Sequence, residues 1–334
     1  MNDKKSIQHL FQSFEGMQVL IIGDVMIDYY LWGKSERMSP EAPVPIVELD
    51  RKESRPGGAA NVAMNIKNLG AIPIICSAIG DDPKGALLLE LLHEHGISNT
   101  NIINIPGRIT TVKSRIFGSN KQMLRIDEED TSMLNVAESK LLQTQIHDLL
   151  DNQEVHAVVF EDYDKGVINP GLIRKVVERC RNAKIPVVVD PKKRNFLEYK
   201  DVSLFKPNLR ELRDGLPCKS DLNNKENLDK AVFALQDKIH AEIVLTTLSE
   251  RGIHFSHKDK YGNRNSGLIP AAVKNIADVS GAGDTVVSIA ALCLAANVPV
   301  ETLAQICNIG GGLVCEQTGV VPVDKEKLII NVNC

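Results

Sequence analysis

The chain has 334 residues, of which 43% are hydrophobic and 25% are charged, and its formal net charge is −4. A chain of this length can bury a large core, and the composition is that of an ordinary soluble globular protein. The slight negative charge and the 4% aromatic content exclude binding to nucleic acid through bulk positive charge or base stacking, so we expect no nucleic-acid partner.

The seven cysteines are scattered along the chain and form no C-x-x-C pair. Their distribution argues against a disulfide framework or a zinc ribbon and favours a reducing, cytoplasmic location. The first 16 residues contain no apolar core of a secretory signal. Because no run of about 18 apolar residues occurs, we expect no membrane-spanning helix and no membrane partner.

The first half of the chain predicts two buried strands among helices. The near-continuous apolar runs at 17–24 and 72–80 are typical of strands buried on both faces. Apolar spacing and terminal signals predict helices at 6–14, 57–70 and 83–95.

Two other segments of the first half lack the pattern of buried strands and helices. Residues 31–54 are rich in proline and charge and predict a loop with one exposed strand outside the main core. Residues 110–126 alternate and are rich in β-branched side chains, which predicts a hairpin around residues 118–121.

From about residue 137 onward, strands and helices alternate regularly. The predicted helices are 137–150, 170–182, 225–238, 281–296 and 299–317, and the predicted strands are 155–160, 185–190, 203–205 and 241–246, with a hairpin at 252–270. This alternation predicts an α/β fold with a mostly parallel central sheet and helices on both faces. No linker divides the chain, so we expect a single domain, 1–334, with excursions at about 33–54 and 106–127 that form a small β lid.

The late stretch DVSGAGDT, residues 278–285, places glycines and a carboxylate at a predicted helix start. Backbone N–H groups at a helix start attract anions, so Gly281, Ala282 and Gly283 are candidates for an anion hole. Asp284 would then be placed to accept the proton of an attacking hydroxyl. A purely structural alternative is a helix capped by Ser280.

The chain lacks the common phosphate-binding signatures. It has no G-x-x-x-x-G-K followed by Ser or Thr, and Gly23 stands alone where a dinucleotide-binding motif needs three glycines. A P-loop enzyme and an ordinary dinucleotide dehydrogenase are therefore both disfavoured.

Three other segments supply polar side chains suited to a sugar and a metal. Asp28 follows the first buried strand, at the edge of the sheet where ligands bind in open α/β folds. Gly57, Gly58 and Asn61 begin a predicted helix and suit contacts with polyol hydroxyls. In KPNLRE, residues 206–211, Asn208 and Glu211 are one helical turn apart and suit water-mediated binding of Mg²⁺. Each segment alone also has an ordinary structural interpretation.

Taken together, GDVMID, RPGGAANVAMN, DPK, NLRE and DVSGAGDT resemble the ribokinase-like carbohydrate kinases of the phosphofructokinase-B type. Their order and spacing match the family along essentially the whole chain. The resemblance implies a ribokinase-like sandwich, an ATP-dependent phosphotransferase with Mg²⁺, and a β lid through which we expect a homodimer.

The resemblance narrows in two segments, 19–49 and 161–166, and most specifically in SPEAPVP, residues 39–45. These are similar to the kinases that phosphorylate D-glycero-D-manno-heptose 7-phosphate at C1 in ADP-heptose synthesis, for lipopolysaccharide or another glycan. Because the chain contains no H-x-G-H motif, the resemblance implies a kinase without an attached nucleotidyltransferase.

The resemblance also implies a role for individual residues. It makes Asp284 the catalytic base, with Gly281, Ala282 and Gly283 as the anion hole. The sugar contacts are Asp28, Gly57, Gly58, Asn61 and Asp162; the ATP contacts are Asn208, Thr247, Ser249, Gly252, Gly283 and Asn308; and Asn208 and Glu211 hold the metal through water. Lys192 is a further candidate ATP contact because it follows strand 185–190 and could face the cleft, with a surface loop lysine as the alternative.

A phosphorylated substrate needs cationic partners. Among the many lid cations we single out Lys113 and Arg125, and in the loop after strand 155–160 we single out Lys165. Solvated surface charge is the alternative for each of them. Two competing functions stay open: another sugar or nucleoside kinase of the same family, and a non-catalytic sugar-phosphate sensor.

Overall fold

The computed structural model describes residues 4–119, 121–216, 221–259, 261–272 and 276–333. In this part of the chain, the strands form one nine-stranded and one four-stranded sheet. The nine-stranded sheet has the order β13-β12-β11-β10-β9-β8-β1-β4-β5, and the four-stranded sheet has the order β3-β2-β6-β7. The strands are β1 Gln18–Gly23, β2 Val25–Met38, β3 Pro45–Gly58, β4 Ile72–Gly80, β5 Ile102–Ile105, β6 Val112–Gly118, β7 Lys121–Glu128, β8 Val155–Glu161, β9 Val187–Asp190, β10 Leu204–Phe205, β11 Ile243–Thr247, β12 Ile253–Lys258 and β13 Arg264–Ile269.

The nine-stranded sheet is parallel from β5 to β11, and β12 and β13 continue it in antiparallel fashion. Strand β1 lies inside it, between β8 and β4. Along β1, Val19 and Ile21 pack into one hydrophobic core, whereas Leu20 and Ile22 pack into the other. All four side chains are fully buried, which explains why this strand is a continuous apolar run and not an alternating one.

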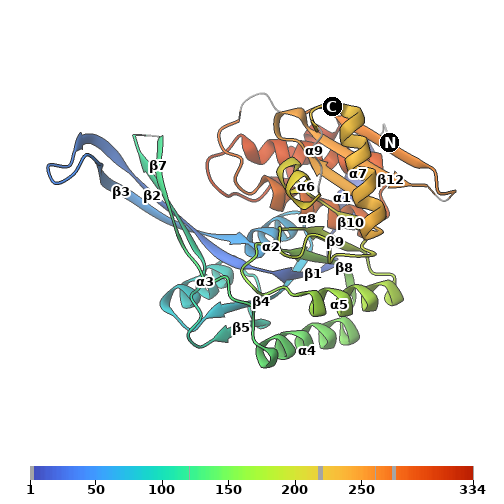
Figure 1. Cartoon of the computed structure of the whole chain (residues 1–334), viewed down its shortest axis with the longest axis horizontal. Helices are drawn as coiled ribbons and strands as arrows, with labels where there is room; N and C mark the ends of the chain where they lie inside the picture. The colour runs from blue at the N-terminus through green and yellow to red at the C-terminus, as the bar shows by residue number, and fades with distance from the viewer. Residues whose placement is uncertain (1–3, 120, 217–220, 260, 273–275, 334) are drawn as a thin grey trace.

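Helices cover both faces of this sheet (Figure 1). One face is covered by α1 Lys4–Ser13, α2 Ala59–Asn68, α3 Pro83–Glu94, α8 Ala282–Ala295, α9 Val300–Cys315 and α10 Lys325–Val332. The other is covered by α4 Val136–Asn152, α5 Pro170–Ala183, α6 Leu209–Gly215 and α7 Lys225–Ile239. The predicted α/β sandwich with a mostly parallel sheet is therefore confirmed.

The four-stranded sheet projects from the main body, as β2, β3 and β7 show in Figure 1. The exposed strand predicted within 31–54 is the outer part of β3, but the predicted loop is wrong, because β2 and β3 are each 14 residues long and pair with each other. The charged side chains of their outer halves are mostly exposed, and Pro40 and Pro43 lie in the irregular turn between the two strands. Strand β3 is at the edge of the sheet, where proline is tolerated.

The helix predicted at 57–70 begins later in the structure. Gly57 and Gly58 end β3, and Gly58 has a φ of 57°, a left-handed conformation that favours glycine. Helix α2 starts at Ala59. Strand β5 and helix α10 were not predicted, since both are short and have no strong periodic pattern.

Across the described residues, no helix has both the length and the apolar character needed to cross a bilayer.

Candidate active site

Functional side chains gather where the parallel strands of the large sheet end. Glu161 ends β8, Asp190 ends β9, Lys206 follows β10 directly, and Thr247 ends β11. The last three line a pocket of about 320 Å³. Ligands of open α/β sheets bind at this carboxyl edge, so the position itself marks a candidate active site.

Most of the predicted nucleotide and catalytic residues meet in this pocket. Its lining includes Lys192, Asn208, Glu211, Thr247, Ser249, Gly252, Gly281, Ala282, Gly283, Asp284 and Asn308. These residues come from segments that are far apart in the sequence, and the fold brings them together.

Helix α8 begins with its first turn facing the pocket. Its N-cap residue is Gly281, which has a φ of 81° and provides no side-chain cap. The alternative of a helix capped by Ser280 is therefore wrong. A Cβ on Gly283 would lie 3.3 Å from Asp190 Oδ2 and 3.4 Å from Lys206 Nζ, so a residue without a side chain fits this crowded turn.

Asp284 is held in place by two hydrogen-bond donors. Asn61 Nδ2 donates to Asp284 Oδ2 at 2.7 Å, and the Tyr163 hydroxyl donates to Oδ1 at 3.0 Å. The residue is only 3% exposed, and this burial raises the pKa of Asp284 to about 6 although both hydrogen bonds oppose the shift. At neutral pH Asp284 is therefore an ionised, oriented carboxylate with a pKa suited to a general base.

Neither Tyr163 nor Asp24 was predicted as a site residue, and Asp24 positions Tyr163. The buried carboxylate of Asp24 accepts hydrogen bonds from the backbone N–H groups of Tyr163, Lys165 and Val167, at 2.8, 3.1 and 3.3 Å. Burial raises the pKa of Asp24 to about 6. One side chain thus fixes the loop after β8 that carries Tyr163 to Asp284.

Glu161, Asp190 and Asp284 form a buried acidic cluster in which one oxygen of each lies within 4.8 Å of the others. Both carboxylate oxygens of Glu161 lack a hydrogen-bond partner among the described residues. Burial, followed by the nearby carboxylate of Asp190, raises the pKa of Glu161 well above its usual value. Glu161 and Asp190 were missed as site residues, and their signal was their position as the last residue of a buried strand.

Lysine ammonium groups partly balance this acidic charge. Lys206 Nζ lies 2.9 Å from Asp190 Oδ2. Burial lowers the pKa of Lys206, but the carboxylates of Asp190 and Glu211 together outweigh it, so the pKa is raised. Lys192 Nζ lies 2.6 Å from Glu211 Oε1. Both lysines line the pocket and therefore suit contact with a nucleotide phosphate.

Asn208 and Glu211 form a reciprocal cap at the start of α6. Asn208 Oδ1 accepts from the Glu211 N–H and Glu211 Oε2 accepts from the Asn208 N–H, each at 2.8 Å. This reciprocal cap is an ordinary structural role for two residues one helical turn apart. Both residues also line the pocket.

The predicted sugar contacts lie beside the same pocket, where β2, β3 and α2 meet. Asp28 is buried and forms an ion pair with Arg115 of β6. A Cβ on Gly57 would lie 2.1 Å from Asp28 Oδ2, so glycine is needed for this carboxylate to keep its place. The amide of Asn61, expected at a sugar hydroxyl, donates instead to Asp284.

Two predicted substrate contacts are engaged elsewhere. Asp162 is buried, and its carboxylate accepts hydrogen bonds from Asn195, Tyr199 and the Asp164 N–H. The Arg125 side chain is 53% exposed and donates twice to Asp127. The structure does not bring either residue into the pocket.

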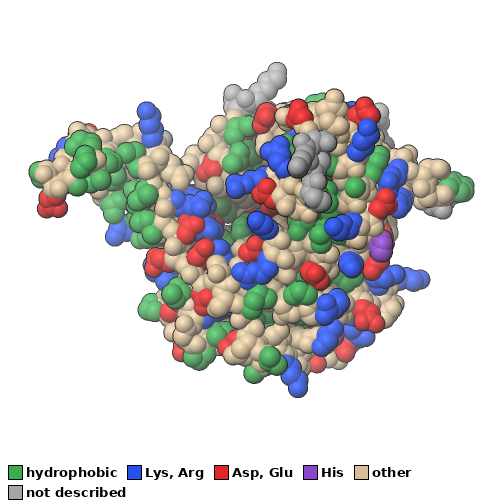
Figure 2. Space-filling model, viewed as in Figure 1, with side chains coloured by type: hydrophobic (Ala, Val, Ile, Leu, Met, Phe, Trp, Pro, Cys, Tyr) green, Lys and Arg blue, Asp and Glu red, His purple; other side chains and the backbone are tan. Residues whose placement is uncertain are grey.

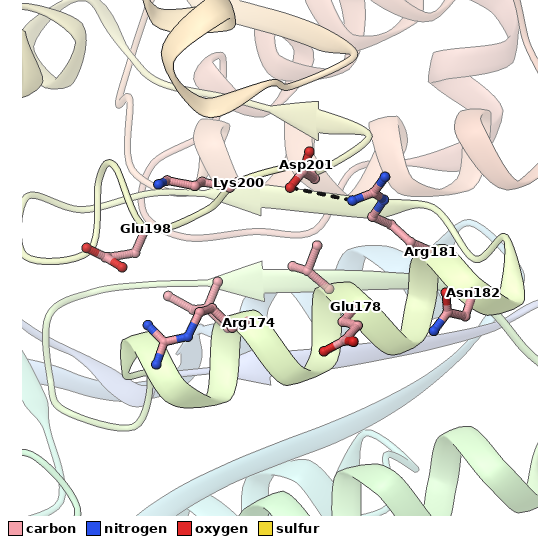
Figure 3. Close-up of a pocket in the computed structure, with 9 residues that line it drawn as sticks. Arg174, Glu178, Arg181, Asn182, Glu198, Lys200 and Asp201 are labelled. Atoms are coloured by element: carbon pink, nitrogen blue, oxygen red, sulfur yellow. Dashed lines mark ion pairs between the residues drawn. The ribbon is translucent and has the colours of Figure 1, made fainter.

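A second hollow, of about 570 Å³, lies on the outside of α5 (Figure 3). Charges of both signs line it, and Arg181 pairs there with Asp201 at 3.5 Å. None of the predicted site residues borders this hollow, so it is separate from the candidate active site.

Comparison with known proteins identifies the family of this chain. The family model described as "pfkB family carbohydrate kinase" matches residues 17–327. The chain is 35% identical over 316 residues to the bifunctional protein HldE of Helicobacter pylori strain J99, and 37% identical over 317 residues to the HldE of Magnetococcus marinus. These matches cover 95% of this chain but only 66% and 64% of the two relatives, so the chain spans about two thirds of their length.

Solved structures show the same fold. Phosphofructokinase-2 from Escherichia coli in complex with fructose-6-phosphate matches with a TM-score of 0.76 at 16% identity, over 95% of this chain and 98% of that one. Ribokinase from Arabidopsis thaliana complexed with ribose and ATP matches with a TM-score of 0.69 at 17% identity, over 95% and 99% of the two chains. The fold is thus ribokinase-like. With the family match over most of its length, the chain belongs to the pfkB family of carbohydrate kinases and is an ATP-dependent sugar kinase.

Proposed function

We propose that this kinase transfers the γ-phosphoryl group of ATP to the C1 hydroxyl of D-glycero-D-manno-heptose 7-phosphate, giving the 1,7-bisphosphate for ADP-heptose synthesis. The substrate assignment is supported by the similarity to HldE across 95% of the chain and by the lid segment at 39–45. One observation carries the chemistry. The carboxylate of Asp284 is fixed by Asn61 and Tyr163 at the first turn of α8, on the pocket wall.

Asp284 would accept the proton of the C1 hydroxyl as its oxygen attacks the γ-phosphorus. The bond from that phosphorus to the β–γ bridging oxygen breaks, and ADP leaves. The backbone N–H groups of residues 281–283 and the ammonium groups of Lys192 and Lys206 would stabilise the negative charge on the transferring group. The Ala282 N–H donates to the Val279 carbonyl at 3.4 Å and would have to leave it to do so. Because the sugar hydroxyl attacks the γ-phosphorus directly, the proposed reaction needs no covalent enzyme intermediate.

We also propose Mg²⁺ as the metal that accompanies ATP. Hard cations prefer carboxylate oxygens, and the site offers Glu211, the carboxylate of Asp190, and the Glu161 oxygens, which no described residue hydrogen-bonds. Asn208 and Glu211 would hold the metal through water, as their motif implies. When bound, Mg²⁺ neutralises phosphate charge on the nucleotide.

The four-stranded sheet is proposed to be both a lid and a dimer interface of a single-domain kinase. Every residue of β7 is exposed, and hydrophobic side chains gather on the projecting part of this sheet (Figure 2). The exposed apolar residues there include Met38, Val44, Leu49, Met123, Leu124 and Ile126. An exposed apolar edge strand of this kind is suited to pairing with a second copy of the chain. The scattered free thiols and the use of ATP fit a cytoplasmic enzyme.

The test is ATP consumption with a panel that contains heptose 7-phosphate, free heptose, fructose 6-phosphate, ribose and a nucleoside. The proposal predicts the highest kcat/KM with heptose 7-phosphate. A higher kcat/KM with another acceptor would show that the chain is a different kinase of this family. Ligand binding without any turnover would favour a sugar-phosphate sensor.

A further inference from the structure

Both oxygens of the Asp284 carboxylate are engaged by side-chain donors, and one of these donors belongs to the pocket wall. The Tyr163 hydroxyl donates to Asp284 Oδ1 at 3.0 Å, and the Asn61 amide donates to Oδ2 at 2.7 Å. Tyr163 lines the pocket, whereas Asn61 reaches Asp284 from α2. The phenol hydroxyl therefore meets the carboxylate from the side on which the nucleotide pocket lies.

The Asn61 amide is itself fixed inside the protein. Asn65 Nδ2 donates to the Asn61 carbonyl at 2.9 Å and lies 3.4 Å from Asn61 Oδ1. The Thr285 hydroxyl donates to Asn65 Oδ1 at 3.0 Å, which ties this pair to α8 one residue after Asp284. Both asparagines are almost fully buried. The carboxylate is thus oriented from the α2 side, and the second hydrogen bond, on Oδ1, can serve another purpose.

Tyr163 is held at both its backbone and its ring. Its N–H donates to Asp24 Oδ2 at 2.8 Å. The Lys192 ammonium lies 5.0 Å from the centroid of the ring, a cation–π contact, and pairs with Glu211 at 2.6 Å. Because backbone and ring are both fixed, the fold itself keeps the hydroxyl at Asp284.

A general base beside the γ-phosphate of ATP can activate water as well as a sugar hydroxyl. Water that gives its proton to Asp284 would attack the γ-phosphorus, the bond to the β–γ bridging oxygen would break, and the products would be ADP and inorganic phosphate. A carboxylate offers about four acceptor sites in all, so each protein donor leaves fewer of them for water. A donor on the pocket side of Asp284 therefore opposes this wasteful hydrolysis.

We propose that Tyr163 protects Asp284 from water, so that the base acts on the sugar hydroxyl and ATP is not hydrolysed when no sugar is bound. The Tyr163 hydroxyl keeps Oδ1 occupied until the acceptor hydroxyl takes over that oxygen. A sugar can displace this neutral hydrogen bond with the binding energy of its other groups, whereas a single water has no such groups. Tyr163 acts through Asp284 and exchanges no bond itself, so it is a residue that determines acceptor specificity by positioning.

The inference rests on the proposed function, because it takes Asp284 as the base, but it holds for any acceptor sugar. The experiment measures release of inorganic phosphate and phosphorylation of sugar separately, with the full chain, ATP, Mg²⁺ and the acceptor that gives the highest kcat/KM. Tyr163→Phe removes only the hydroxyl and keeps the ring beside Lys192. Assays at pH 8, above the pKa of about 6 of Asp284, keep this carboxylate ionised.

Tyr163→Phe should raise ATP hydrolysis in the absence of sugar by about 3- to 10-fold, the effect of one lost hydrogen bond. The kcat for sugar phosphorylation should fall by no more than about tenfold. Tyr261→Phe, at a tyrosine that is 77% exposed, is the matched control and should leave both rates unchanged. If Tyr163→Phe does not fold, as judged by thermal unfolding with and without ATP, Tyr163→Leu carries the same expectation.

The outcomes separate this role of Tyr163 from the proposed function. A purely structural role would lower both rates together, so hydrolysis that falls or stays unchanged overturns the inference and leaves the proposed function intact. The double variant Tyr163→Phe, Asp284→Asn should lose the added hydrolysis, and a gain that survives in it also overturns the inference. A gain that depends on Asp284, in a protein whose best acceptor is not heptose 7-phosphate, supports the inference and refutes the substrate assignment.

Discussion

The side-chain amide of Asn61 lies 2.7 Å from Asp284 Oδ2, although the two residues are 223 positions apart in the sequence. The contact joins α2 to the first turn of α8, which carries the carboxylate proposed as the base. Together with the Tyr163 hydroxyl, the amide orients both oxygens of a carboxylate that burial would otherwise leave poorly stabilised. The proposed chemistry depends on this arrangement.

Replacement of the base should abolish most of the activity. In Asp284→Asn the amide cannot accept the proton of the attacking hydroxyl, so we expect kcat to fall by about 10²- to 10⁴-fold. The KM for ATP should change little, because the nucleotide pocket keeps its shape. Steady-state kinetics measures both values, with Asp148→Asn, an exposed residue of α4, as the control. Near-normal kcat in Asp284→Asn would rule out its role as base.

The pH dependence of kcat/KM should have an acidic limb at about pH 6, which is the pKa of Asp284. The sign follows from the mechanism, since the base must be ionised and activity is lost as pH falls through its pKa. Hydrogen bonds from Asn61 and Tyr163 stabilise the ionised form. Tyr163→Phe should therefore raise the pKa and move the limb to higher pH. A pH profile of the two proteins checks this, and a limb that stays in place or moves to lower pH would contradict the assigned hydrogen bond.

A single methyl group at Gly57 should damage sugar binding. In Gly57→Ala the new Cβ would lie 2.1 Å from Asp28 Oδ2, so the carboxylate must move away from its pairing with Arg115. We expect KM for the sugar to rise by about tenfold or more, the cost of one lost charged hydrogen bond. The KM for ATP serves as the internal control. Equal rises in both values would point to general damage instead of a local effect on Asp28.

Charge on the exposed face of β7 should dissociate the proposed dimer. Leu124 and Ile126 are 55% and 46% exposed, and burying them against a second copy would remove apolar surface from water. The double variant Leu124→Asp, Ile126→Asp should sediment as a monomer at micromolar concentration. The variant Gln122→Asp adds charge on the same exposed strand without removing apolar surface and should stay dimeric. A double variant that remains a dimer would place the interface elsewhere.

Much of the large sheet and of the nucleotide side could be predicted because local pattern and position agree there. Buried parallel strands are continuous apolar runs, and β1 and β8 were recognised for that reason. Residues such as Asn208 and Gly281 belong to short motifs whose spacing reflects a helix start. Strand β2 was missed and β3 was predicted only in part, because the outer halves of these strands are exposed in a projecting sheet and lack both apolar continuity and strict alternation.

The remaining site residues depend on contacts that only the folded chain creates. Asp24, Glu161 and Asp190 look like ordinary polar residues at strand ends, and their burial follows from packing of neighbouring strands and helices. Arg125 and Lys113 look equivalent in the sequence as lid cations. The register of β6 and β7 separates them, because it turns Lys113 toward Glu129 and leaves Arg125 exposed beside Asp127.

The proposed function rests on phosphoryl transfer to C1 of heptose 7-phosphate. The most direct measurement is ³¹P and ¹³C NMR of the product formed from ATP, Mg²⁺ and D-glycero-D-manno-heptose 7-phosphate. Transfer to C1 should give a second phosphate whose phosphorus couples to the anomeric carbon, and Asp284→Asn should form about 10²- to 10⁴-fold less of this product in the same time. A new phosphate on any other carbon, or no transfer to heptose 7-phosphate while another sugar is phosphorylated, would contradict it.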